Sequence, residues 1–304
     1  MNRRLFLKNS TYSTILLTSG SLVGLANPLI ADVTKLTILH TNDVHSRIDP
    51  FPMDGSKSEG RGGVAKRASL IKQIRSSENN VLLLDAGDIF QGTPYFNFFH
   101  GEIEMKLMSE MGYDAATIGN HDFDGGMDGL IKSLDNANFP LLVTNYDFEN
   151  TEMKDKTLPY KIFKKGGLKI GVFGVGIELN GLVPKSLYKE TIYSDPIAAA
   201  EKYGAILKNE EKCDYIICLS HLGYKYNEDK ISDRVLAKET SYIDLIIGGH
   251  THTFLSEPER TLNKINKPIL INQVGWAGMV LGRLDIYFEK NKKGRCDTCK
   301  NIVI

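Results

Sequence analysis

The chain has 304 residues, of which 42% are hydrophobic and 24% charged, a composition typical of a folded globular protein. Lysine plus arginine equals aspartate plus glutamate, at 37 each, so no basic field is present that would recruit nucleic acid. The length fits one large α/β domain or two small ones.

The N-terminal residues have the pattern of an export signal. A cationic start with Arg3-Arg4 precedes a mildly apolar stretch, and the small residue Ala31 offers a cleavage position. The run R-R-L-F-L-K resembles the twin-arginine export signal. We therefore expect residues 1–31 to be a signal peptide and residues 32–304 to act in the periplasm.

We expect no stable membrane anchor. The apolar stretch is short and diluted with Ser, Thr and Gly, and the first cysteine, Cys213, is too late in the chain to carry a lipid. Cys213 and Cys218 flank an apolar run and are predicted to be buried thiols. Cys296 and Cys299 form a C-x-x-C pair that we interpret as a tail disulfide, with a zinc or redox role as the alternative.

Short apolar runs predict buried strands, and apolar residues at helical spacing predict helices between them. The predicted strands cover residues 36–40, 81–84, 115–118, 141–144, 160–164, 168–175, 213–219, 243–247, 269–273 and 281–288. The predicted helices cover residues 62–75, 102–111, 129–137 and 196–207. This alternation is typical of βαβ units, and Gly166-Gly167 predicts a hairpin. We expect one α/β domain of two packed mixed sheets flanked by helices, with the last two strands completing the second sheet.

Side chains that can bind metals follow five of the predicted strands, at the sheet edge where α/β proteins bind ligands. Five of the seven histidines occupy these positions. Carboxylate, imidazole and amide oxygen suit Zn, Mn, Fe or Co, so we predict two divalent metal ions with Asp88 as their bridge. The predicted ligands and their neighbours are Asp43 and His45, Asp88, Asn120 and His121, His221, and His250 and His252.

Each loop has a plainer interpretation when it is taken alone. Gly119 to Asp124 could be a polar turn in which Asp124 caps the following helix. An isolated His-x-His pair is usually incidental. The concordance of five loops favours the dinuclear site.

The blocks D-x-H, G-N-H-D, a lone His after a strand, and G-H-x-H resemble the signature of the calcineurin-type metallophosphoesterases. More narrowly, residues 39–45, 119–124 and 272–275 are similar to the catalytic domain of bacterial periplasmic 5′-nucleotidases. The resemblance runs from about residue 34 to residue 290, with all blocks in family order. It implies a four-layer αββα sandwich.

The resemblance also implies a role for each site residue. Asp43, His45 and His252 correspond to the ligands of one metal. Asn120, His221 and His250 correspond to the ligands of the other, and Asp88 to the bridge. His121 with Asp124 corresponds to the catalytic pair. Many 5′-nucleotidases have Gln in place of His252, which leaves the preferred metal open.

The expected chemistry follows from these residue types. Two cations roughly 3.5–4 Å apart neutralise phosphoryl oxygens, lower the pKa of a bound water and align its in-line attack on a phosphate ester. His121 would face the phosphoryl or leaving oxygen as a charged donor, oriented by Asp124. Asp122 and Asp85 are interpreted as loop-shaping residues.

Three functions are weighed. The first is a phosphomonoester hydrolase that acts on nucleotides. The second is a phosphodiesterase, a cyclic-nucleotide hydrolase or a related sulfur-compound hydrolase on the same scaffold. The third is an inactive metal-binding scaffold protein, which the presence of His121 and Asp124 disfavours. Typical relatives continue into a nucleotide-specificity domain, which we expect a separate chain to supply because this sequence stops at Ile304.

Two aromatic features have open interpretations. The cluster between Phe90 and Phe99 fits packing under a loop better than the wall of a substrate cleft. Trp276, the single tryptophan, fits a position at the rim of the site as well as it fits packing.

Overall fold

The computed structural model describes residues 33–289 and 295–304, with side chains from residue 299 onward in the second stretch. The predicted export signal, residues 1–31, lies outside the described residues. Among the helices that are described, none is long and apolar enough to cross a membrane.

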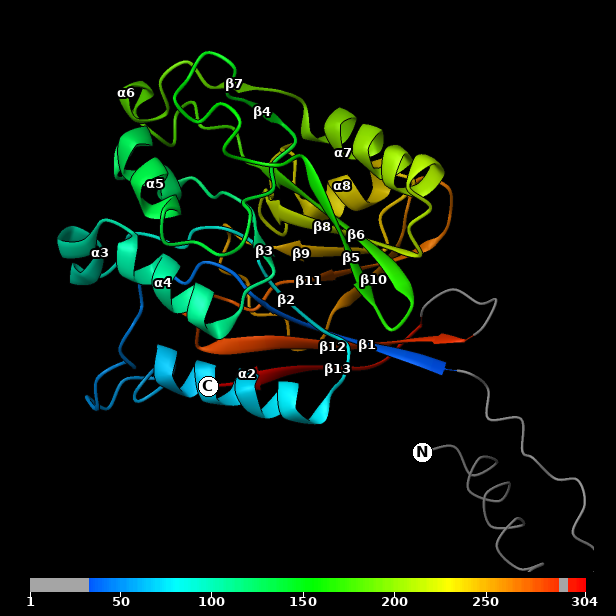
Figure 1. Cartoon of the computed structure of the whole chain (residues 1–304), viewed down its shortest axis with the longest axis horizontal. Helices are drawn as coiled ribbons and strands as arrows, with labels where there is room; N and C mark the ends of the chain where they lie inside the picture. The colour runs from blue at the N-terminus through cyan, green and yellow to red at the C-terminus, as the bar shows by residue number, and fades with distance from the viewer. Residues whose placement is uncertain (1–32, 290–294) are drawn as a thin grey trace, which may run out of the picture. The chain divides into compact units, whose positions relative to one another are not determined.

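The first sheet is built on β1 (Val33–Thr41), whose two neighbours come from distant parts of the chain (Figure 1). β2 (Val81–Asp85) pairs with β1 in parallel, and β12 (Val280–Glu289) pairs antiparallel on its other side. With β3 (Ala115–Ala116) and β13 (Arg295–Val303), the order in the described residues is β13-β12-β1-β2-β3. The sheet is therefore mixed, with parallel pairing on the β2 side of β1 and antiparallel pairing on the β12 side.

The second sheet has the order β10-β11-β9-β8-β6-β5 in the described part of the chain. β5 and β6 form the predicted hairpin, in which Gly166 and Gly167 both have positive φ. β6, β8, β9 and β11 run parallel, and β10 is an antiparallel edge strand. The strands are β5 (Tyr160–Lys165), β6 (Leu168–Gly176), β8 (Tyr215–His221), β9 (Leu245–Gly248), β10 (Glu259–Leu262) and β11 (Pro268–Asn272), and a separate pair joins β4 (Tyr146–Asp147) to β7 (Ile192–Tyr193).

The two sheets pack face to face. Successive side chains of a strand point to opposite faces, so each strand contributes to the core between the sheets and to the core under the helices. Leu82 and Leu84 belong to the apolar cluster between the sheets, whereas Leu83 belongs to the cluster that faces helices. α2, α4 and α5 cover the outer face of the first sheet, and α7 and α8 that of the second. The predicted four-layer αββα architecture is thus confirmed. The helices are α2 (Val64–Ser77), α3 (Pro94–Phe99), α4 (Glu102–Met111), α5 (Gly126–Leu134), α6 (Lys185–Tyr188), α7 (Pro196–Ala205) and α8 (Asp233–Glu239).

The prediction for residues 281–288 was wrong in one respect. They form a strand, but β12 lies in the first sheet, antiparallel to β1, and not in the second sheet beside β11. The connecting loop, with positive φ at Gly275, Ala277 and Gly278, redirects the chain from one sheet to the other.

The strand predicted over residues 141–144 is also absent from the described sheets. The backbone N–H groups of Leu142, Val143 and Thr144 bond to three separate segments, at Ala116, Leu158 and Gly174 respectively. A regular ladder needs one partner strand, so this segment instead ties the edge of the first sheet to the second sheet.

Cys213 and Cys218 are buried free thiols, as predicted. Cys299 is disulfide-bonded, in agreement with the predicted tail disulfide. The side chain of its predicted partner, Cys296, lies outside the described residues. The backbone of both cysteines belongs to β13, an element that the sequence pattern did not predict.

Candidate metal centre

Five loops bring the predicted ligands together where strands of both sheets end. The first sheet contributes the residues after β1, β2 and β3, and the second sheet contributes the ends of β8 and β9. All seven predicted ligands lie in this one place, in two groups.

The first group joins Asp43 and His45 with His252, across a sequence separation of about two hundred residues. The Nε2 atoms of His45 and His252 are 3.0 Å apart, and His252 Nε2 is 3.4 Å from Asp43 Oδ1. One ligand atom from each residue lies within 4.8 Å of the others, which is close enough to hold one ion.

The second group joins Asp88 with His221 and His250, and it meets the same distance criterion. His221 Nε2 lies 3.0 Å from Asp88 Oδ2. The side-chain oxygen of Asn120 lies 2.8 Å from His250 Nδ1, so the amide reaches the same group.

Asp88 lies between the two groups. Its Oδ2 is 3.0 Å from the Nε2 of His221 and 3.8 Å from that of His45 in the first group. One carboxylate therefore lies within 4 Å of a histidine nitrogen from each group.

A buried nitrogen without a hydrogen-bond partner tests whether metals fit the centre. His221 Nε2 is fully buried and makes no hydrogen bond of proper geometry, although Asp88 Oδ2 lies 3.0 Å away. Buried polar atoms nearly always have partners. Ligand atoms that converge without bonding to one another are expected where they share a cation, so the donor set fits a divalent metal.

The electrostatics of the centre also favour a cation. Burial would raise the pKa of Asp88, but the imidazoles of His221 and His45 hold it well below its usual range. Burial lowers the pKa of His221, and Asp88 and Asp43 raise it to about 10. The buried carboxylates thus need positive charge beside them, which a metal ion supplies more strongly than an imidazolium.

Backbone hydrogen bonds orient two of the imidazoles. His45 Nδ1 is 3.2 Å from the carbonyl oxygen of Phe90, and His221 Nδ1 is 2.7 Å from that of Ala86. When Nδ1–H donates to a carbonyl, the lone pair is on Nε2, which is the atom that faces the centre.

The loop backbone at the centre is strained. Non-glycine residues rarely adopt positive φ, and strain of this kind concentrates at functional sites. Five of the predicted ligands have φ between 49° and 72°. They are Asp43, His45, Asp88, His250 and His252.

Gly119 is required by close approach rather than by its φ. A Cβ at this position would lie 2.2 Å from Asp88 Oδ1 and 2.4 Å from the Asp88 backbone nitrogen. Any side chain there would displace the central carboxylate.

The predicted catalytic pair lies beside the metal groups. His121 Nδ1 is 2.7 Å from Asp124 Oδ2, and the backbone N–H of His121 donates to Asp88 Oδ1 at 2.8 Å. The hydrogen bond to Asp124 raises the pKa of His121, and the Asp88 charge raises it further. The half-exposed imidazole therefore lies next to Asp88 with its protonated form favoured by the hydrogen bond to Asp124.

Asp122 shapes the loops, as predicted. Its carboxylate accepts backbone N–H groups from Asp88, Ile89, Phe90 and Gly119, at 2.7–3.1 Å. It therefore ties the loop after β2 to the loop after β3. Asp85 has a similar local role, because it accepts from the Thr41 hydroxyl and the backbone N–H of Gly87.

The aromatic cluster after Asp88 divides in two. Phe90 and Phe96 are buried in the core, in line with the packing interpretation. Phe98 and Phe99 are exposed and line a cavity of about 330 Å³ together with Arg47 and Tyr95.

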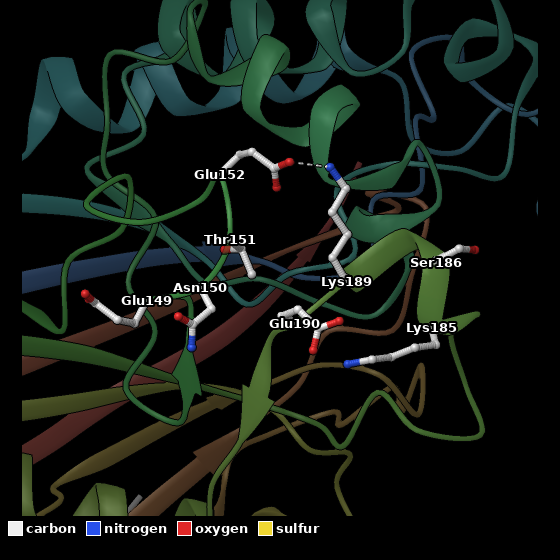
Figure 2. Close-up of a pocket in the computed structure, with 8 residues that line it drawn as sticks. All are labelled: Glu149, Asn150, Thr151, Glu152, Lys185, Ser186, Lys189 and Glu190. Atoms are coloured by element: carbon white, nitrogen blue, oxygen red, sulfur yellow. Dashed lines mark hydrogen bonds and ion pairs between the residues drawn. The ribbon is translucent and has the colours of Figure 1, made fainter.

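A larger cavity, of about 690 Å³, contains none of the predicted site residues (Figure 2). Its lining mixes charges of both signs, and Lys189 is paired there with Glu152 at 2.7 Å. Its lining residues include neither aspartate nor histidine, the residue types that form the two metal groups.

Sequence reasoning left the role of Trp276 open. Its ring stacks on His252, with centroids 5.7 Å apart and planes 8° from parallel. Trp276 is thus at the rim of the centre. In the sequence, the sign of this position was that Trp276 closely follows the predicted strand 269–273.

Comparison with known proteins agrees with this geometry. The model of the calcineurin-like phosphoesterase family matches residues 36–254. The chain is 36% identical to the snake venom 5′-nucleotidase of Gloydius brevicauda in an alignment of 276 positions that covers 84% of this chain and 45% of that protein. It is also 36% identical to the 5′-nucleotidase of Homo sapiens in an alignment of 299 positions that covers 91% of this chain and 50% of that protein.

Among solved structures, the 5′-nucleotidase precursor from Thermus thermophilus matches with a TM-score of 0.81 and 30% identity, over 89% of this chain and 55% of that one. The calcineurin-like phosphoesterase YfkN from Bacillus subtilis matches with a TM-score of 0.70 and 25% identity, over 89% of this chain and 90% of that one.

The chain therefore belongs to the calcineurin-like phosphoesterase family. Within that family it is similar to 5′-nucleotidases, and it spans about half the length of the curated relatives it matches.

We predict that Asp122→Asn destabilises the fold by about 1–3 kcal/mol, because the amide leaves some of the four buried N–H groups without an acceptor. Urea unfolding of the metal-free protein measures this. The control is Asp128→Asn, whose exposed carboxylate lies on α5 and should change stability by less than about 1 kcal/mol. Equal effects of the two substitutions would contradict the loop-shaping role.

Proposed function

We propose that this chain is a dinuclear-metal phosphomonoester hydrolase that acts on nucleotides. The observation that carries the proposal is the position of Asp88 between two ligand groups, with the His121–Asp124 pair hydrogen-bonded beside it. The similarity to proteins named 5′-nucleotidases supports a nucleotide as the substrate.

Each ion would be held by its own group of residues. Asp43, His45 and His252 would hold one ion. Asn120, His221 and His250 would hold the other, and Asp88 would serve both. When bound, the ions supply charge neutralisation of the phosphoryl oxygens and a lower pKa for water. Zn, Mn, Fe and Co each suit this mixture of imidazole, carboxylate and amide ligands.

His121 is the proton donor. Its Nδ1 is engaged by Asp124, which leaves Nε2 free to donate toward the phosphoryl or leaving oxygen. The hydrogen bond to Asp124 raises the pKa of His121, which favours the proton-donating form of the ring. Asp124 holds the ring in one orientation, so the donor does not need to be reoriented during the reaction.

The cellular setting is part of the proposal. The twin-arginine-like residues 1–31 would direct the chain to the periplasm, and this export suits a protein that folds around its metals first. A separate chain that carries a nucleotide-specificity domain stays a prediction.

A substrate panel tests the function. Metal-loaded protein should hydrolyse p-nitrophenyl phosphate and AMP, and it should act much more slowly on bis-p-nitrophenyl phosphate. Cyclic AMP serves as the second diester. Faster turnover of the diesters would identify a phosphodiesterase, and no turnover of any ester by the fully metal-loaded protein would favour the scaffold interpretation.

Asp88→Asn should lower the content of both ions, because one carboxylate contacts both groups. His252→Gln is the matched comparison and should affect only the first group, and more mildly, because an amide oxygen can still bind. Metal content after gel filtration, measured by mass spectrometry, decides this. Two ions per chain in Asp88→Asn would contradict the bridging role.

His121→Ala should reduce turnover by roughly 10²–10⁴-fold while the metal content stays near two ions, since a positioned proton donor contributes about that much. His100→Asn, which changes an exposed histidine on the loop after α3, is the control and should leave turnover unchanged. Loss of metal along with activity would instead make His121 a ligand.

A further inference from the structure

We propose that Trp276 is a positioning residue for the metal ion of the first group, because it holds the imidazole of His252 in the ligating orientation. The inference rests on the proposed metal-binding role of Asp43, His45 and His252. It concerns a residue that is not itself a ligand.

His252 lacks the support that other imidazoles of the centre have. His45 and His221 each have Nδ1 hydrogen-bonded to a backbone carbonyl. Within the described residues, no group hydrogen-bonds Nδ1 of His252, and 40% of its side chain is exposed. A metal-binding histidine usually needs a partner on its second nitrogen to fix the ring.

The stack with Trp276 supplies that constraint. The two rings are nearly parallel, at 8°, and their centroids are 5.7 Å apart, within the range of offset stacking. Rotation of the imidazole out of this plane would break the contact, and in the plane observed Nε2 lies 3.0 Å from His45 Nε2 and 3.4 Å from Asp43 Oδ1.

The loop that carries Trp276 is fixed to both ligand loops of the first group. The backbone N–H of Ala277 donates to the Asp43 carbonyl at 2.7 Å, and that of Gly275 donates to the Thr253 carbonyl at 2.9 Å. The Asn42 side chain also donates to the Gly275 carbonyl, at 2.6 Å. These bonds fix the position of the indole relative to the loops that carry Asp43 and His252.

A second aromatic layer supports the indole. Phe51 meets Trp276 edge to face, with ring centroids 5.8 Å apart, and the Arg47 guanidinium lies 4.2 Å from the centre of the Phe51 ring. The indole is therefore held by its neighbours and can act as a fixed surface for His252.

The test uses the fact that Trp276 is the single tryptophan, so all tryptophan emission of the protein comes from the residue that stacks on His252. Metal-free full-length protein is titrated with Zn²⁺, and bound zinc is counted separately by mass spectrometry. We expect the emission to change as one of the two ions binds. The change should be lost in His252→Gln and kept in His221→Gln, which alters only the second group.

A second arm measures affinity by chelator competition. Trp276→Leu should weaken one of the two zinc sites by roughly 10–100-fold, the usual effect of losing a residue that orients a ligand. Trp276→Phe, which restores a flat ring, should recover most of that loss. Phe254→Leu is the control, because it removes a ring packed on Gly275 without removing the indole.

The outcomes separate the two proposals. No zinc uptake by the wild type would overturn the metal centre and this role with it. Uptake of two ions without any change in Trp276 emission would overturn only the role of Trp276. So would equal zinc affinity in Trp276→Leu and the wild type. If Trp276→Leu fails to fold, the emission arm still decides the question, because it leaves the indole in place.

Discussion

The structure depends on burying one ionised carboxylate, Asp88, at the meeting point of two sheets. A buried anion is costly unless opposite charge and hydrogen-bond donors surround it. Here the His221 imidazole, whose pKa is raised to about 10, supplies positive charge, the backbone N–H of His121 supplies a donor, and His45 Nε2 lies 3.8 Å from the carboxylate. Together with Asp88 itself, these residues come from four different loops, so the requirements of a single side chain draw the ends of both sheets together.

A second carboxylate makes the first one possible. Asp122 collects backbone N–H groups from the loops after β2 and β3 and so fixes the strained backbone at Asp88. Burial raises the pKa of Asp122 to about 7, and the charge of Asp88 raises it as well. The negative charges of Asp88 and Asp122 therefore repel each other, although Asp122 holds the backbone of Asp88 in place. A cation bound by Asp88 would reduce that repulsion.

The sequence patterns located the strand ends that carry the centre, but they did not reveal every strand pairing. Apolar runs mark strands locally, so the exits at Asp43, Asp88 and His221 could be located without knowledge of the pairing. The sheet to which β12 belongs could not be predicted in this way, because its pairing with β1 joins residues that are far apart in the sequence. The segment at 141–144 has the apolar character of a strand, but it distributes its hydrogen bonds among three partners.

Details of the site that rest on non-local geometry were also hidden. No local pattern indicates that Trp276 stacks on His252, since their contact depends on where the β11–β12 loop crosses between the sheets. The loop-shaping role of Asp122 was accessible, because the loop already held more polar groups than two ions and one donor require. Its four N–H partners are known only from the structure.

The pairing of β1 with β12 has a consequence for how the protein is made. Val33 lies opposite Glu289, so β1 is completed by a strand that is synthesised much later. Contacts this distant along the chain slow folding, because a long loop must close before they form. Until residues 280–289 leave the ribosome, β1 has an unpaired edge, and the loop at Asp43 cannot take its final place. The first sheet is therefore expected to form late and all at once, with a period during synthesis in which β1 has an open edge that a chaperone could protect.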